Sequence, residues 1–214
     1  MLQITRFVFN PFQENTYLLY DDVSLDAIVV DAGMYYKEES EAIDKFIADN
    51  RLHLVMAVST HMHLDHCFGV EYLKEKYNVK LAANSADKEL GYALPMQCRR
   101  FGINSIECGL SIDRALCNGD EIKLGGSTLK VIHLPGHSPG GIALYCAEQK
   151  FVIVGDSLFK GSIGRTDLDG GDHAALISSI KSGLMSLPDD TTVLSGHGEP
   201  TTIGFERRNN PYIR

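Results

Sequence analysis

The 214-residue sequence has no apolar segment approaching the roughly 20 consecutive residues that a membrane-spanning helix needs. Its N-terminus lacks a basic stretch followed by an apolar core and a small-residue cleavage site, so no secretory signal is expected. Positive charge is also scarce, because 20 Lys and Arg stand against 28 Asp and Glu, a net charge of −8. The chain therefore lacks the excess of positive charge that is typical of nucleic-acid-binding proteins. We therefore expect a small-molecule substrate, and neither a nucleic-acid nor a membrane partner.

The cysteines show no sign of a disulfide framework. There are five, an odd number, and none are spaced as CxxC: Cys67, Cys98, Cys108, Cys117 and Cys146. Free thiols of this kind are typical of a reducing compartment, which predicts a cytoplasmic location. Cys67 directly follows a histidine of the site described next, so it could approach a metal there, but packing as a small buried residue is the preferred interpretation.

The chain contains no internal repeat, low-complexity tract or Pro/Ser-rich linker, so residues 1–214 are predicted to form a single domain. Apolar patterning predicts alternating strands and helices in both halves. The strands are expected at about 3–9, 15–21, 27–31, 52–59, 78–83, 121–125, 128–134, 141–146, 150–154 and 192–195. The helices are expected at about 37–50, 67–77, 85–100 and 173–186, with Asp172 as the N-cap of the last. This alternation favours a layered α/β fold of mixed sheets covered by helices.

Four of the predicted strands run directly into potential metal ligands. LHLVMAVST leads into HMHLDH, LKVIHLPG into His137, FVIVG into Asp156, and TVLSG into His197. Open α/β folds place their sites at the carboxyl ends of strands, so these residues are expected to converge. Glycines adjoin the later ones, at Gly136, Gly155 and Gly196, and allow sharp turns there.

The residue types at these strand ends suit a two-metal site. Imidazole and carboxylate ligands bind zinc, iron or manganese, and no cysteine stands at a ligand position. The seven donors exceed the three or four of one open site, so two ions are predicted, zinc being preferred. One ion is assigned His61, His63 and His137, the other Asp65, His66 and His197, and Asp156 bridges them. Any one of these residues could instead be a hydrogen-bonded polar side chain at a strand end. The remaining histidines, His53, His133 and His173, are interpreted as structural.

The motifs THMHLDH, PGH, GD and SGHG, in this order, resemble the metal-binding motifs of the metallo-β-lactamase superfamily. The resemblance spans about 60 to 198 and implies a four-layer αββα sandwich of that type. The segment DSLFKGSIGRTDLDGGD is similar to the glyoxalase II-like (hydroxyacylglutathione hydrolase) branch. Typical glyoxalase II enzymes carry a C-terminal helical extension that helps to hold glutathione, whereas only 17 residues follow His197 here. The thiol carrier is therefore left open.

The resemblance implies a metallo-hydrolase that cleaves thioesters such as S-acylglutathione, by attack of a metal-bridging hydroxide on the carbonyl. Asp65 would orient the hydroxide as well as bind metal. Arg165 and Lys160, in the glycine-rich loop after Asp156, are candidates for binding a substrate carboxylate, Arg165 through a bidentate fork. Either could instead be a solvated loop cation, Lys160 more readily than Arg165.

Several other functions are compatible with the same fold. A persulfide dioxygenase would hold a single iron on His61, His137 and Asp156, and such enzymes also carry a GRTD-like loop. Lactone or β-lactam hydrolysis is less favoured, and RNA cleavage less again, because the acidic chain has no evident RNA-binding insertion. A non-catalytic binding module is disfavoured because no ligand position is lost. The sequence leaves the oligomeric state open.

Overall fold

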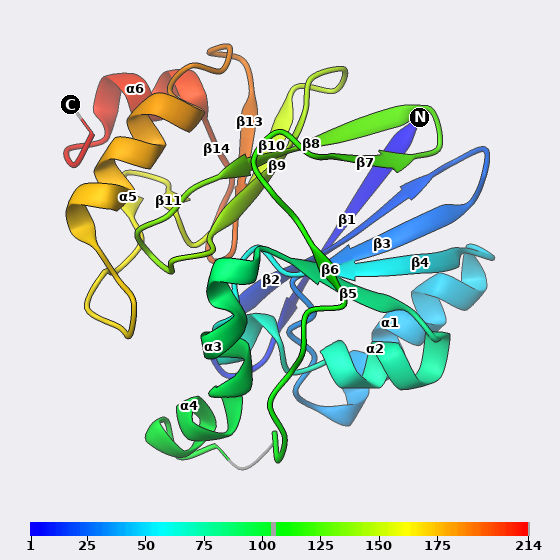
Figure 1. The fold of residues 1–214 in the computed structure, drawn as a ribbon. Coiled ribbons are helices and arrows are strands. Elements are labelled where there is room, and N and C mark those ends of the chain that lie inside the picture. Colours follow the sequence, from blue (N-terminus) through cyan, green and yellow to red (C-terminus); the bar gives the residue numbers. More distant parts are fainter. Residues whose placement is uncertain (104–105, 214) are drawn as a thin grey trace.

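The computed structural model describes residues 1–103 and 106–213, and contains two six-stranded sheets (Figure 1). Their orders are β1-β2-β3-β4-β5-β6 and β14-β13-β10-β9-β8-β7. The first sheet comprises β1 (Leu2–Phe9), β2 (Glu14–Asp21), β3 (Asp26–Val30), β4 (His53–Val58), β5 (Lys80–Ala83) and β6 (Arg114–Ala115). The second comprises β7 (Glu121–Leu124), β8 (Ser127–His133), β9 (Ile142–Cys146), β10 (Phe151–Gly155), β13 (Thr192–Ser195) and β14 (Thr201–Thr202). Both sheets mix antiparallel pairs, such as β1–β2 and β8–β9, with parallel pairs, such as β4–β5 and β10–β13.

Helices cover the outer face of each sheet (Figure 1). The first sheet carries α1 (Lys37–Asp49) and α2 (Val70–Tyr77), and the short helices α3 (Lys88–Tyr92) and α4 (Leu94–Arg100) follow β5. The second sheet carries α5 (His173–Ser179), the π-helical turn η3 (Ile180–Leu184) and α6 (Ile203–Asn209). On α1, Ile43 and Ile47 are four residues apart and both buried, so one face of the helix packs on the sheet.

Three apolar layers separate these elements. Adjacent residues of β2 point to opposite faces, so Leu18 packs beneath the helices of the first sheet while Leu19 packs between the two sheets. Val152 of β10 packs beneath Leu176 of α5 in the third layer. Because strands buried on both faces need apolar side chains on both, they appear in the sequence as nearly continuous apolar runs. The predicted four-layer αββα sandwich is confirmed.

The long predicted strands are confirmed to within a few residues at each end, but several short elements differ from the predictions. The helix predicted over 85–100 is divided, because Pro95 lies in the first turn of a new helix and lacks the N–H that would continue the preceding one. The helix predicted from 67 begins at Val70, after a 3-10 turn at Leu64–His66. The predicted N-cap Asp172 is confirmed, since its side chain accepts a hydrogen bond from Ala175.

Several short elements lie outside the predicted set. The glycine-rich loop contains a small hairpin of β11 (Leu158–Phe159) and β12 (Ser162–Ile163). The segment after His197 forms β14 and α6, and β6 extends the edge of the first sheet. None of the helices among the described residues is long and apolar enough to cross a membrane.

Candidate metal centre

All seven predicted metal donors lie at one edge of the sandwich. The loop after β4 carries four of them, the loop after β8 one, the turn at the end of β10 one, and the loop after β13 the last. In this order they are His61, His63, Asp65, His66, His137, Asp156 and His197. The structure thus brings together residues from both sheets, and close donor groups form among them. Their roles as ligands remain predictions.

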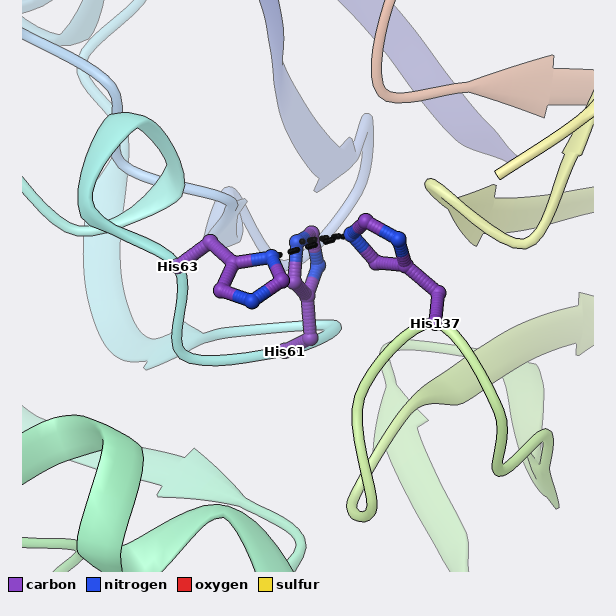
Figure 2. A group of neighbouring side chains, drawn as sticks. All are labelled: His61, His63 and His137. Carbon is purple, nitrogen blue, oxygen red and sulfur yellow. Dashed lines mark hydrogen bonds between the residues drawn. The ribbon is translucent and has the colours of Figure 1, made fainter. Parts of the chain in front are cut away.

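The first group consists of three imidazoles whose nitrogens converge (Figure 2). Nδ1 of His63 lies 2.9 Å from Nε2 of His137, and the latter lies 3.2 Å from Nε2 of His61. In a tetrahedral zinc site with Zn–N bonds of about 2.0–2.1 Å, neighbouring nitrogens are separated by roughly 3.3 Å. The spacing of these nitrogens therefore fits three ligands of one ion.

The second group combines two imidazoles with a carboxylate. Oδ2 of Asp65 lies 3.1 Å from Nε2 of His197 and 3.7 Å from Nε2 of His66. The side chains of His66 and Asp65 are buried or nearly so, and that of His197 is 26% exposed. A mixed His/Asp set of this kind suits zinc, iron or manganese, as the sequence predicted.

Asp156 faces both groups. Its Oδ1 lies 3.4 Å from Nε2 of His66, and its Oδ2 lies 3.5 Å from Nε2 of His197 and 3.8 Å from Nε2 of His137. One carboxylate oxygen thus adjoins an imidazole of each group. This position is what a bridging ligand requires.

Buried polar atoms without a hydrogen-bond partner are concentrated here. Among the described residues such atoms are Nε2 of His63, both ring nitrogens of His66, Oδ1 of Asp156, Oε1 of Glu14 and Oγ1 of Thr191. An unpaired buried polar group is costly, so most are paired in native proteins. Nε2 of His66 and Oδ1 of Asp156 face each other across the centre, and a cation would satisfy both. The donor set therefore fits bound metal.

The electrostatics of the two groups differ. Burial, together with the neighbouring imidazoles, lowers the pKa of His61 well below its usual value and that of His63 to about 3. Both rings are therefore neutral, which is the form that binds metal. Burial would also lower the pKa of His66, but the carboxylates of Asp65 and Asp156 outweigh it and raise this pKa. Neutral imidazoles thus predominate in the first group, whereas the carboxylates stand beside the imidazoles of the second group.

Main-chain carbonyls fix the orientation of two histidines. Nδ1 of His137 donates to the carbonyl oxygen of Arg165 at 2.8 Å, and Nδ1 of His197 donates to that of Phe12 at 3.1 Å. A proton on Nδ1 leaves Nε2 unprotonated and directed to the centre. Arg165 therefore has a backbone role at the site in addition to the side-chain role predicted from the sequence.

Asp31, which the sequence analysis did not single out, contacts His66 of the second group and is linked to His61 of the first group through Thr60. Its two oxygens accept hydrogen bonds from the backbone N–H and Oγ1 of Thr60, each at 2.7 Å, and Oγ1 lies 3.1 Å from Nδ1 of His61. Oδ2 of Asp31 also lies 3.1 Å from Nδ1 of His66. Asp31 directly follows the buried strand β3. Its place at the end of an apolar strand is the same pattern that identified the metal donors, so the sequence could have indicated it.

Asp87 connects the two loops that carry the first group. Its carboxylate accepts hydrogen bonds from the backbone N–H of Met62 at 3.0 Å, from Oγ of Ser138 at 2.8 Å and from the backbone N–H of Gly140 at 2.5 Å. Met62 lies between the two histidines of its loop, and Ser138 follows His137. Burial raises the pKa of Asp87, while these hydrogen bonds oppose the rise. No sequence pattern marks this residue.

The beginning of β2 holds the loop that carries His197. The Asn15 side chain donates to the carbonyl oxygens of Ser195 at 2.9 Å and Gly198 at 3.0 Å. The Tyr17 hydroxyl also donates to Ser195, at 2.7 Å. Because β2 belongs to the first sheet and His197 follows the second, these bonds join the two sheets at the centre.

A cavity of about 230 Å³ opens from the centre, and the two predicted substrate-binding cations lie differently around it. Arg165 lines the cavity, but Nε and Nη2 of its guanidinium each donate to an oxygen of Asp167 at 2.7 Å. Lys160 is exposed and lines a separate, shallower hollow on the other side of His197. The structure therefore does not bring Arg165 and Lys160 to one carboxylate-binding position.

The residues interpreted as structural contribute to none of the donor groups found in the described part of the chain, although Sγ of Cys67 lies 3.9 Å from the carbonyl oxygen of His61. Cys67 is buried, its Sγ lies 3.9 Å from the Ser59 hydroxyl, and burial raises the pKa of its thiol. His53 is largely exposed, Nε2 of His133 contacts the carbonyl of Pro139, and the remaining histidine begins α5. These positions agree with packing and surface roles.

Comparison with known proteins identifies the family to which this chain is similar. The family profile described as Metallo-beta-lactamase superfamily matches residues 9–197. Hydroxyacylglutathione hydrolase GloC of Haemophilus influenzae is 40% identical over 203 residues, which cover 94% of this chain and 93% of that protein. The solved structure of BLEG-1 B3 metallo-beta-lactamase has a TM-score of 0.87 and 33% identity, covering 100% of this chain and 99% of its own. That of TTHA1623 in a di-iron-bound form has a TM-score of 0.85 and 35% identity, with coverages of 97% and 99%.

Proposed function

This chain belongs to the metallo-beta-lactamase superfamily, and from that premise we propose that it hydrolyses thioesters at a centre of two metal ions. The observation that carries the proposal is the pair of adjacent donor groups with Asp156 between them, opening into a cavity. The similarity to a protein named hydroxyacylglutathione hydrolase favours a thioester, such as S-acylglutathione, as substrate. All five cysteines are free, which supports a reducing, cytoplasmic location as part of the same proposal.

The proposed ligands follow the two groups. His61, His63 and His137 would hold one ion, Asp65, His66 and His197 the other, and Asp156 would bridge them. Zinc suits these donors, and iron and manganese are the alternatives. The similar protein TTHA1623 has been solved in a di-iron-bound form, which supports iron as an alternative. A bound pair of divalent ions supplies hydroxide near neutral pH and polarises a carbonyl oxygen.

The chain's own residues would position the reactants. Asp65 lines the cavity, and its Oδ2 lies 3.1 Å from Nε2 of His197. Its remaining lone pairs can accept a hydrogen from the attacking water and orient it towards the thioester carbon. The apolar side chains of Phe12 and Phe101 flank the cavity and limit the entry of bulk water. The leaving thiolate needs no general acid, because a thiol is acidic enough to depart as the anion.

Metal content and thioester hydrolysis should be measured in the same preparation. We expect close to two metal ions per chain under metal-replete conditions, hydrolysis of S-lactoylglutathione or a related acylglutathione, and loss of the activity on chelation with recovery on metal return. The two complete donor groups are the reason for this stoichiometry. A ceiling of one iron per chain, with oxygen-dependent turnover of glutathione persulfide, would instead favour the mononuclear dioxygenase. Hydrolysis of lactones or β-lactams without thioester hydrolysis would also contradict the proposal.

Arg165 is the better candidate for binding a carboxylate on the thiol carrier, because it lines the cavity and Lys160 does not. Such a contact persists from the bound substrate to the transition state, so Arg165→Ala should raise KM for glutathione thioesters and leave kcat largely intact. A charge-assisted hydrogen bond contributes about 1.5–3 kcal/mol. Because Arg165 is half exposed and already paired with Asp167, we expect the lower end, an increase of roughly tenfold.

Asp167→Asn provides the complementary variant. It removes the competing charge from Arg165, so KM for the same thioesters should fall. Lys160→Ala should leave KM unchanged, and metal content should be unchanged in all three variants. Equal KM values for wild type and Arg165→Ala would contradict the carboxylate contact and leave Arg165 as a solvated loop cation.

A further inference from the structure

The walls of the cavity beside the candidate centre consist mainly of hydrocarbon. Apart from the metal-donor residues, its apolar lining is contributed by Phe12, Leu64, Leu90, Phe101 and Leu168. These residues come from the loop before β2, the loop after β4, helix α3, the end of α4 and the glycine-rich loop. Phe12 and Phe101 are in edge-to-face contact, with ring centroids 5.7 Å apart. This contact closes one side of the cavity with two aromatic rings.

The one amide side chain in the lining is already hydrogen-bonded. Oε1 of Gln97 accepts from the backbone N–H of Leu64 at 3.1 Å, and Nε2 donates to the carbonyls of Met62 at 3.2 Å and Leu90 at 2.9 Å. Both protons of this amide are therefore used. A hydroxyl group of a substrate could accept a hydrogen bond from Gln97 only by displacing one of these backbone carbonyls, which leaves that carbonyl unpaired.

The two arginines in the lining are also paired. Arg100 donates to Asp169 at 3.1 Å, and Arg165 is forked onto Asp167. Both side chains are about half exposed, 52% for Arg100 and 55% for Arg165, so they lie at the rim. Each positive charge has a carboxylate beside it. Inside the rim, beyond the proposed metal-binding residues, the cavity offers a substrate mainly apolar surface.

We propose that this cavity receives the acyl half of the substrate and that the acyl group is a short apolar chain. The inference rests on the proposed thioester hydrolysis. The polar thiol carrier would lie at the rim of the same cavity, where Arg100 and Arg165 are half exposed and Arg165 is proposed to bind its carboxylate. The volume of about 230 Å³ lies below the roughly 300–1,000 Å³ of sites for drug-sized ligands, so a chain of a few carbons fits better than a long fatty acid.

The test is a series of acylglutathiones that share one thiol: lactoyl, propionyl, butyryl, hexanoyl and dodecanoyl. Burial of each added methylene should raise kcat/KM about threefold to fourfold until the cavity is filled. Propionyl should be preferred to lactoyl, which has the same three carbons and adds a hydroxyl that must lose its water on entering mainly apolar surroundings. Dodecanoyl should be poorer than hexanoyl because it exceeds the cavity.

Phe101→Ala and Phe205→Ala form a matched pair of variants. The two phenylalanines are similarly exposed, 41% and 39%, but Phe205 lies on α6 and does not line the cavity. Phe101→Ala should flatten the dependence on chain length, whereas Phe205→Ala should retain it. Metal content should be equal in both, which shows that the centre is intact.

The outcomes separate the inference from the proposed function. Efficient hydrolysis with no dependence on acyl length would overturn the apolar acyl site and leave the thioesterase proposal standing. A dependence that appears only when the thiol is varied at constant acetyl group would assign the cavity to the other half of the substrate and also overturn the inference. Absence of thioester hydrolysis from protein with two bound metals would overturn the proposed function itself.

Discussion

Replacing Asp156 with alanine is expected to remove metal and hydrolytic activity together. The side chain lies between the two donor groups, within 3.4 Å of Nε2 of His66 and 3.8 Å of Nε2 of His137. If it bridges two ions as proposed, its loss leaves each ion one ligand short and removes the negative charge that both share. Because metal would supply both the nucleophile and the charge stabilisation, the rate should fall by more than about a thousandfold.

The measurement is metal content by elemental analysis beside kcat/KM for an acylglutathione. Asp156→Asn keeps the volume and one neutral oxygen donor, so it should retain part of the metal. Asp169→Ala is a suitable control, because this carboxylate also lines the cavity but belongs to none of the donor groups among the described residues. Retention of two metals and near-normal turnover by Asp156→Ala would show that the assignment of ligands is wrong.

The elements that could be predicted from the sequence are those with a local signal. The long strands are apolar runs bounded by turns, because both of their faces are buried. Runs of this length are too short for most helices and therefore predict strands. The donors were found because they stand at the ends of these runs, as at Gly155–Asp156. Their convergence followed from a general property of such sheets. The position of each donor at the end of a strand was therefore enough to predict that the seven would lie together.

The residues around the centre carry no such signal, because long-range contacts define them. Asp87 joins two loops through three hydrogen bonds to residues 25, 51 and 53 positions away. The cavity walls combine Phe12, Leu90 and Phe101, which have no shared periodicity along the chain. Short elements such as β6 and β14 exist through pairing with a neighbouring strand, not through the propensity of two residues. Only the folded arrangement identifies these positions.

Gly196→Ala is expected to disrupt the centre nearly as strongly as loss of Asp156. The sequence indicated a sharp turn for the glycines beside the donors, and Gly155 does adopt a left-handed backbone with φ of 51°. The requirement at Gly196 is close approach instead. A Cβ there would lie 2.2 Å from Oδ1 of Asp156 and 2.6 Å from Cε1 of His66. Both atoms belong to proposed ligands, so the methyl group would displace the bridging carboxylate and an imidazole of the second group.

Gly198→Ala is the matched control for this variant, because Gly198 lies two residues further along the same loop. A Cβ at Gly198 would meet nothing within 4 Å, but its φ of 74° lies in the left-handed region. That substitution should lower stability by about 1 kcal/mol through backbone strain and leave metal content unchanged. Gly196→Ala should lower both metal content and rate. Overpacking should also reduce the free energy of unfolding by about 1–3 kcal/mol, which would be seen as a lower thermal midpoint. Two bound metals and normal turnover in Gly196→Ala would mean that the loop after β13 can move away from Asp156. Tight packing of this loop against the centre would then no longer explain why glycine precedes His197.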